Sequence, residues 1–369
     1  MKLALAGDTM LGRGAAGRLA RVPPTALFAD GVVAAAREAD LLILNLECAI
    51  SDRGEPWPDP GKPFFFRAPP IAVEALRRLG VGCVTLANNH ALDFGTVALL
   101  DTCRHLTNAG IAWVGAGVDE TAARTPVVLE RDGLRVGVVG VTDHPADYAA
   151  AIDRPGVAYA DLRHRTPDWL LDTVRHVDAD AVVVSPHWGP NMVVEPVAHV
   201  RSAASALLDA GAAIVAGHSA HVFHGVADRV LYDLGDFIDD YARDPDLHNE
   251  LGLLWLVTFD GPVPTRVEAV PLALDHCHTR LADRDETAWI SNRLHRACDA
   301  LGTAVEERAG RFVIEWAPNG DGRIRRAPSS STAAHSDTPI RVCPATCSPT
   351  GSDRRPDRSR SASTFPASM

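Results

Sequence analysis

Short apolar runs alternate with helical patterns along most of this chain, and that alternation limits the fold more than any other feature. Each run is too short for a helix and rich in Val, Ile and Leu, as buried strands are. Strands are predicted at residues 3–6, 41–44, 81–86, 136–141, 181–184, 212–215 and 253–258, and helices at 71–79, 97–108, 169–176 and 197–210. Apolar stretches around Asp132-Gly133 also predict a hairpin. Mixed βαβ units with hairpins favour two packed sheets flanked by helices.

Composition excludes several classes of protein. The 369 residues carry a formal net charge of -11, which disfavours a nucleic-acid partner. Seven cysteines without a C-x-x-C pair predict no disulfide framework and fit a reducing compartment. We expect no membrane span, because no apolar run has the length that crossing a bilayer requires, and no secretory signal, because Asp8 interrupts the first apolar run. A cytoplasmic location is therefore the expectation.

The chain divides into three parts by composition. Residues 1–275 carry the alternating pattern and are predicted to form one domain. Residues 276–326 hold an amphipathic helix at 286–301 and the apolar run RFVIEW, and are predicted to pack on that domain. Residues 327–369 are rich in Ser, Pro, Thr and Arg and predict a disordered tail. Cys343 and Cys347 in this tail lack a second ligand pair, so we interpret their spacing as incidental.

The first glycine-rich stretch, GDTMLGRG, resembles a phosphate-binding loop only in part. Gly7 and Gly12 have the right spacing, but Arg13 and Gly14 stand where a nucleotide-binding loop has Lys followed by Ser or Thr. The nucleotide interpretation is therefore weak. The alternative is that the first strand carries Asp8 to the carboxyl end of a sheet, where α/β folds place ligands.

Other predicted strands also end in polar side chains. A single histidine there is most often a satisfied structural group, and Asn-Asn is usual in turns. Several polar strand ends together are not well explained as separate structural groups, because burying uncompensated polar groups near a core costs free energy. Carboxylate, amide and imidazole groups match the ligands of Zn, Mn or Fe. The residues concerned are Asp8, Glu47, Asn88, Asn89, His90, His187, His218 and His221.

A set of ordered motifs carries a resemblance to a known family. These motifs are GDTMLGR, NLECAI, FFFRAPP, LANNHALDFG, WVGAG, SPHWGPN, LLDAGAAIVAGHSAHVFHGV and YDLGDFI, between about Lys2 and about Pro271. In this order they resemble the CapA family of bacterial capsule and poly-gamma-glutamate synthesis proteins, within the calcineurin-like metallophosphoesterase superfamily. The resemblance implies a four-layer α/β/β/α sandwich of two mixed sheets, with a metal site at the strand ends.

The resemblance also implies roles for individual residues. Glu47 matches the carboxylate that bridges two metals, and His90 matches the general acid beside an Asn ligand. One or two divalent transition-metal ions, Mn, Zn or Fe, are expected. The implied metal ligands are Asp8, Glu47, Asn89, His187, His218 and His221.

Two motifs depart from the superfamily pattern. Met10 stands where many phosphoesterases have a histidine, and the last motif is His-x-x-His in place of His-x-His. A thioether is a poor ligand for Zn, Mn or Fe, so the site nearest Asp8 and His221 is expected to be the weaker of two. Asp236 in YDLGDF is a candidate to supply the missing ligand.

Two classes of function fit these features. The first is a metal-dependent hydrolase that cleaves a phosphoester or a γ-glutamyl amide in a small molecule or a polymer. The second is a non-catalytic or assembly component of polymer synthesis or export, acting with partner proteins of that machinery. An amide ligase is less favoured because no complete nucleotide motif is present.

Some further side chains are weaker candidates for the same site. Arg13 and Arg67 are candidates to hold a substrate phosphate or carboxylate. Glu195 and the pair Asp143 and His144 are weaker candidates for the rim.

Overall fold

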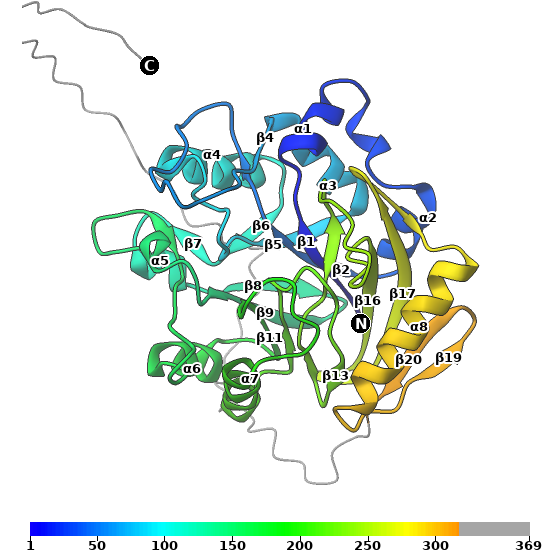
Figure 1. Ribbon diagram of the computed structural model, residues 1–369. Coiled ribbons are helices and arrows are strands. Elements are labelled where there is room, and N and C mark those ends of the chain that lie inside the picture. Colours follow the sequence, from blue (N-terminus) through cyan, green and yellow to red (C-terminus); the bar gives the residue numbers. More distant parts are fainter. Residues whose placement is uncertain (317–369) are drawn as a thin grey trace, which may run out of the picture. The chain divides into compact units, whose positions relative to one another are not determined.

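The computed structural model describes residues 1–316, and the strands of that part form two large mixed sheets (Figure 1). The larger is ten-stranded, with β1 at its centre between parallel β2 and antiparallel β16. Its strands are β1 (Lys2–Thr9), β2 (Leu41–Leu46), β5 (Val81–Thr85), β6 (Ala112–Val114), β15 (Asp236–Ile238), β16 (Leu251–Asp260), β17 (Val263–Asp275), β18 (His278–Leu281), β19 (Glu306–Arg308) and β20 (Arg311–Glu315).

The smaller sheet is six-stranded and is built around three parallel strands, β9, β11 and β12. Its members are β8 (Val127–Arg131), β9 (Leu134–Thr142), β11 (Ala181–His187), β12 (Ile214–Ala216), β13 (Val226–Ala227) and β14 (Val230–Leu231). Two short pairs lie outside both sheets: β3 (Ala49–Ile50) with β4 (Arg67–Ala68), and β7 (Ala116–Gly117) with β10 (Gly156–Val157).

The sheets and helices stack in four layers, from the top to the bottom of Figure 1. One apolar cluster joins the first four helices to the outer face of the larger sheet, a second fills the space between the sheets, and a third joins α6 and α7 to the smaller sheet. The helices are α1 (Arg13–Leu19), α2 (Asp30–Ala36), α3 (Val73–Leu79), α4 (Gly95–Asn108), α5 (Glu120–Arg124), α6 (Asp168–His176), α7 (Ala198–Ala210) and α8 (Arg284–Asp299). The predicted α/β/β/α sandwich is thus confirmed.

The segment after residue 275 joins the same body. Helix α8 begins at a capping box in which Asp283 and Glu286 satisfy each other's backbone N–H groups. Its buried face, with Ile290, Leu294 and Cys298, belongs to the cluster between the sheets. Strands β18 and β20 both pair with β17, so this segment widens the larger sheet. The domain boundary at residue 275 stays a prediction.

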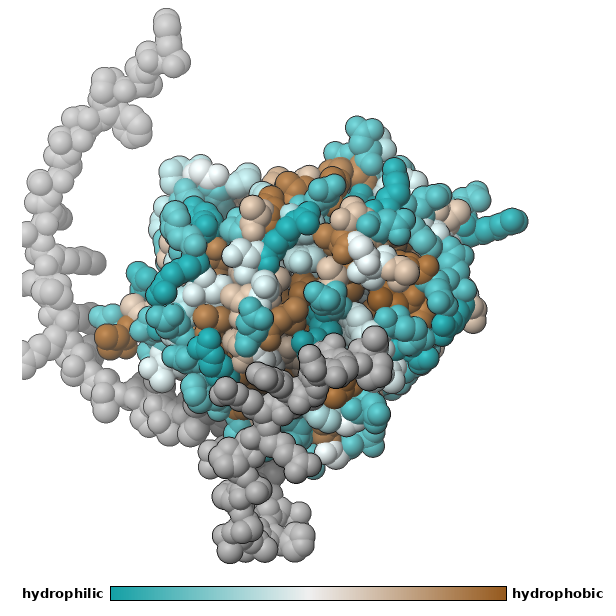
Figure 2. Space-filling model, turned by 90° about the horizontal axis from the view of Figure 1, so that it is seen from below, coloured by the Kyte–Doolittle hydropathy of each residue, from teal (hydrophilic) through white to brown (hydrophobic). Residues whose placement is uncertain are grey.

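Each predicted strand overlaps a strand of the structure, and the hairpin at Asp132-Gly133 joins β8 to β9. The helix predicted from residue 71 opens as a 3-10 turn (Pro70–Ala72) before α3, and Pro70 stands at the first position of that turn, where the missing N–H has no partner to lose. The face shown in Figure 2 is largely hydrophilic, with hydrophobic patches between the charged side chains.

No helix of the described part has the length and apolarity needed to cross a membrane. The cytoplasmic location stays a prediction. The predicted tail at 327–369, with Cys343 and Cys347, lies outside the described residues.

Candidate metal centre

Close backbone packing at the start of the chain places Asp8. A Cβ on Gly7 would lie 1.7 Å from the carbonyl oxygen of Gly235, so only glycine allows β1 to approach this segment. The N–H of Asp8 donates to that same carbonyl, at 2.9 Å. Gly7 therefore allows β1 to pack closely against the segment at Gly235. This role gives no support to the phosphate-loop interpretation of the glycines. The parallel pairing of β1 with β15 sets Asp8 directly beside Asp236.

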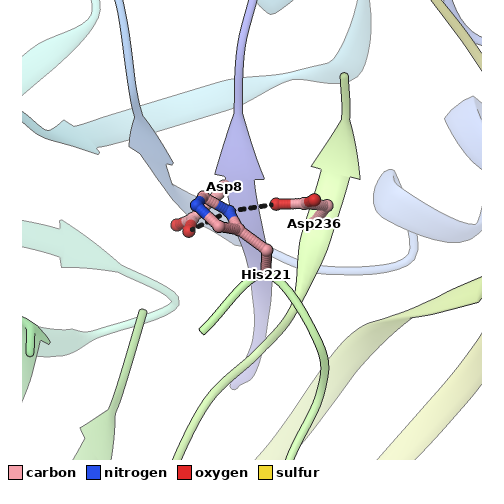
Figure 3. A group of neighbouring side chains, drawn as sticks. All are labelled: Asp8, His221 and Asp236. Carbon is pink, nitrogen blue, oxygen red and sulfur yellow. Dashed lines mark hydrogen bonds and ion pairs between the residues drawn. The ribbon is translucent and has the colours of Figure 1, made fainter. Parts of the chain in front are cut away.

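Asp8, His221 and Asp236 form the first group of converging ligand atoms (Figure 3). The imidazole of His221 lies between the two carboxylates, with Nδ1 2.9 Å from Oδ1 of Asp236 and 3.5 Å from Oδ2 of Asp8. All three side chains are buried. Asp236, which the sequence offered only as a candidate, thus joins this group, and its role as the ligand missing at Met10 stays a prediction.

Asp8, Glu47 and His187 form the second group. Glu47 follows β2 directly, and its N–H donates to the carbonyl of Thr9 on the neighbouring strand. Nε2 of His187, at the end of β11, lies 3.2 Å from Oε1 of Glu47 and so links the two sheets. Asp8 belongs to both groups, whereas Glu47 belongs to one. The bridging role predicted for Glu47 stays a prediction.

His218 lies beside these groups. Its Nδ1 is 3.0 Å from Oδ1 of Asp8, and its Nε2 is 3.0 Å from the hydroxyl of Ser185. Its backbone forms a bridge to His187 at the end of β11. The imidazole of His218 therefore lies against Asp8, the residue common to both ligand groups.

The two consecutive asparagines have different surroundings. Asn88 is fully satisfied as a turn residue, since its amide donates to Asn45 and Leu46 and its oxygen accepts from the N–H of His90. Asn89, in contrast, has a buried Oδ1 with no hydrogen-bond partner. That free amide oxygen is what the predicted ligand role requires.

His90 is oriented by a carboxylate that sequence reasoning did not single out. Its Nδ1 lies 2.6 Å from Oδ2 of Asp93, and its ring packs edge-on against Phe66. Lys62 approaches the same network, with Nζ 3.0 Å from Oδ1 of Asp93 and donating to the backbone oxygen of Asn89. The position of Asp93, three residues after His90 in the motif NNHALD, could have indicated this residue from the sequence.

The buried charges are poorly balanced by the protein alone. Burial raises the pKa of Glu47 and the neighbouring Asp8 adds to that rise, while burial and then Asp239 raise the pKa of Asp236. Burial also raises the pKa of Asp8, but the hydrogen bond and charge of His218 outweigh it and lower that pKa below its ordinary value. Burial lowers the pKa of His187 far below its ordinary value. Burial also lowers the pKa of His90 to about 4, although the charge of Asp93 raises it. Carboxylates buried together fit a site built for a cation.

Backbone strain marks the loop that carries two of the histidines. Ser219 has φ 108° and His221 has φ 60°, in the left-handed region that side chains with a Cβ rarely adopt. The N–H of Ser219 donates to Oδ2 of Asp8, and Asp233 accepts from the N–H of Ala220. These contacts hold the strained turn, which aims His221 at Asp8 and Asp236.

A cavity of about 390 Å³ opens beside this centre. Asn89, His90 and His221 line one part of it, and Tyr241 is also in its wall, with its ring edge-on to His221 at 5.2 Å. Burial and then the charge of Glu47 raise the pKa of Tyr241, so its hydroxyl stays protonated. The sequence had singled out neither Tyr241 nor Asn191 as a site residue, although Asn191 ends the motif SPHWGPN.

The predicted arginines are differently placed. Arg13 stacks on Phe64 and Phe66 near the cavity, and its Nε lies 3.1 Å from Oδ2 of Asp240. Arg67 stacks on Phe94 and donates to the backbone oxygens of Arg53 and Gly54, away from the cavity lining.

Three other residues singled out in the sequence also have defined surroundings. Met10 is buried in the apolar cluster under the helices, which is why it offers nothing to the centre. The ring of His144 lies 5.0 Å from that of His187 and is held by Asp143, whereas Glu195 is exposed.

Comparison with known proteins decides the family. A family model described as bacterial capsule synthesis protein PGA_cap matches residues 2–241, more than half of the chain. The chain belongs to this family. A probable polyglutamine synthesis accessory protein of Mycobacterium tuberculosis is 33% identical over 291 residues, covering 73% of this chain and 75% of that protein.

Two CapA proteins match a shorter stretch. The capsule biosynthesis protein CapA of Bacillus anthracis is 32% identical over 179 residues, or 46% of this chain and 42% of that protein. The PGA biosynthesis protein CapA of Bacillus subtilis is 31% identical over 175 residues, or 46% of this chain and 45% of that protein. The resemblance to CapA proteins that the motifs predicted is confirmed.

Proposed function

We propose that this family member is a metal-dependent hydrolase that cleaves a phosphoester or a γ-glutamyl amide bond in capsule or poly-gamma-glutamate biosynthesis. The observation that carries the proposal is the pair of buried ligand groups that share Asp8 beside a cavity lined by His90. Burying several carboxylates without Lys or Arg partners costs free energy, and a purely structural network has no use for that arrangement.

The residues present fit a divalent transition metal. Several ligand-type atoms of the described site are buried without a hydrogen-bond partner: Oε2 of Glu47, Oδ1 of Asn89, Nδ1 of His187 and Oδ2 of Asp236. Mixed carboxylate, amide and imidazole donors suit Mn, Zn or Fe. When bound, such a metal supplies Lewis acidity and activates water for attack.

The remaining chemistry falls to side chains of this chain. Asp93 fixes the ring of His90 through Nδ1 and leaves Nε2 for proton exchange in the cavity, while the charge of Asp93 counteracts the lowering of the His90 pKa by burial. Tyr241 offers a protonated hydroxyl in the cavity wall. Of the two predicted arginines, Arg13 lies nearer the cavity, because it stacks on Phe64 of that wall, but its guanidinium already contacts Asp240.

A hydrolysis assay tests the proposal. The protein reconstituted separately with Mn, Zn and Fe is assayed on p-nitrophenyl phosphate, bis-p-nitrophenyl phosphate and γ-glutamyl p-nitroanilide. We expect turnover with at least one metal, lost in Glu47→Gln. The absence of turnover on all three substrates, in protein that binds metal, would reject the hydrolase.

One observation favours a second candidate. The Mycobacterium tuberculosis relative is named an accessory protein, which fits a non-catalytic or assembly component acting with polymer-synthesis proteins. Such a component would bind metal without turnover. The same assay therefore separates the two candidates.

A further inference from the structure

The cavity beside the candidate metal centre is lined by both polar and apolar side chains. The polar ones include Asn89, His90, Asn191, His221 and Asn249. The apolar wall is formed by Pro63, Phe64, Met192, Tyr241 and Ala242, which come from three separate segments of the chain. Ligand sites commonly combine such apolar walls with a few convergent polar groups.

Two apolar side chains of this wall are exposed. The exposed fraction is 51% for Phe64 and 38% for Met192. Contact of apolar side chains with water is unfavourable, so an apolar group that covers them would gain binding free energy.

Met192 is held in place at a conformational cost. Its φ of 56° lies in the left-handed region, and its N–H donates to the carbonyl of Ala220 at 3.0 Å. Ala220 immediately precedes His221, so the position of Met192 is tied to the metal centre. Strain of this kind at a binding wall points to a ligand contact.

The cavity offers little to a second charged group of a substrate. Lys62 is the one Lys or Arg in the described lining, and its Nζ is already engaged by Asp93 and by the backbone of Asn89. Arg13 is not in the described lining; it stacks on the Phe64 ring, and its guanidinium contacts Asp240. A polyanion would therefore find no free cationic side chain along this wall.

We infer that the substrate carries an uncharged apolar or aromatic group next to its reactive phosphoryl or acyl group, and that this apolar group lies between Phe64 and Met192. The inference rests on the proposed function and narrows it. It selects compounds with one charged end at the metal centre, such as an aryl phosphoester or a γ-glutamyl amide of an apolar amine. It disfavours a chain of carboxylates in this cavity.

Binding of phosphonates tests the inference without turnover. Phenylphosphonate and methylphosphonate have the same anionic head and differ in the apolar group. Calorimetric titration of the metal-loaded full chain should show phenylphosphonate binding about tenfold more tightly, as burial of a ring predicts. Phe64→Ser and Met192→Ser should each reduce that preference to less than about threefold.

Ile152→Ser is the matched control, because Ile152 is exposed on another part of the surface and should preserve the preference. Met192→Ser also distinguishes an effect of the apolar wall from an effect of Arg13, because Arg13 contacts Phe64 and not Met192. Equal affinity for both phosphonates would overturn the inference while leaving the metal centre intact. An unchanged preference in both wall variants would overturn it as well. Failure of both phosphonates to bind metal-loaded protein would also overturn the inference, whereas the proposed function is decided separately by the hydrolysis assay.

Discussion

The carboxylates of Asp8 and Asp236 lie on paired residues of the parallel strands β1 and β15 and flank the imidazole of His221. Strand pairing brings together two acids that are 228 positions apart in sequence (236 minus 8). Burial keeps both from water, so their charges are balanced only by histidines and by any cation that binds.

Asp236→Asn is expected to remove one of two metal equivalents. The substitution keeps the size of the side chain but removes the anionic ligand beside His221 and Asp8. Elemental analysis after reconstitution and desalting measures the change. Asp209→Asn, at an exposed acid on α7, is the control and should retain both equivalents. Retention of two equivalents in Asp236→Asn would remove Asp236 from the ligand set.

Met10→His is expected to destabilise the protein and not to tighten metal binding. The sequence pattern suggested that an imidazole at this position would complete a weak site, but the structure buries Met10 among apolar side chains. A polar ring there loses hydrogen bonds to water, at a cost of about 1–3 kcal/mol in the free energy of unfolding. Met10→Leu should change that energy by less than about 1.5 kcal/mol. Chemical denaturation measures both variants, and higher metal affinity in Met10→His would show that the ring reaches the centre.

His90→Ala is expected to leave metal content intact and to lower the hydrolytic rate by about 10²–10⁴-fold. The ring contacts Asp93 and Phe66 and belongs to neither ligand group of the described site. Steady-state kinetics and elemental analysis are measured on the same preparation. Asp93→Asn should lower the rate in the same direction because it loosens the ring. Loss of metal in His90→Ala would make His90 a ligand.

Asp101→Asn is expected to lower stability in a pH-dependent way. Hydrogen bonds from Arg53, joined by one from Ser51, lower the pKa of Asp101 to about 2 although its burial raises it. Because the folded-state pKa lies below the unfolded value, the carboxylate stabilises the fold above about pH 4 and loses that effect as pH falls toward 2. Since Arg53 is largely exposed, the contribution at pH 7 is only about 1 kcal/mol.

Urea denaturation at several pH values compares wild type with Asp101→Asn. The gap in unfolding free energy should be full at pH 7 and should narrow steadily as pH falls below about 4 toward 2. A gap that is constant with pH would show that Asp101 acts through shape and not through charge.

The layered fold could be predicted because its strands are short, apolar and bounded by helices, features that local periodicity records. The ends of those strands also gave Asp8, Glu47, His187 and His221, because parallel strands bring their carboxyl ends to one side. Tyr241 escaped, because it reaches the cavity through loop geometry that no periodicity encodes. The strand-end pattern did not separate Asn88 from Asn89; the family resemblance selected Asn89, whose oxygen is free, whereas Asn88 is satisfied in the turn.

The number of metal ions bound by the wild-type protein and by Asp8→Asn tests the central claim most directly. Asp8 is the residue common to both ligand groups. Each protein is reconstituted with Mn, Zn or Fe, desalted, and analysed for metal per chain, with circular dichroism to verify folding. We predict two equivalents in the wild type and none in folded Asp8→Asn. One or two equivalents retained by folded Asp8→Asn, or less than one in the wild type with every metal, would contradict a shared centre at Asp8.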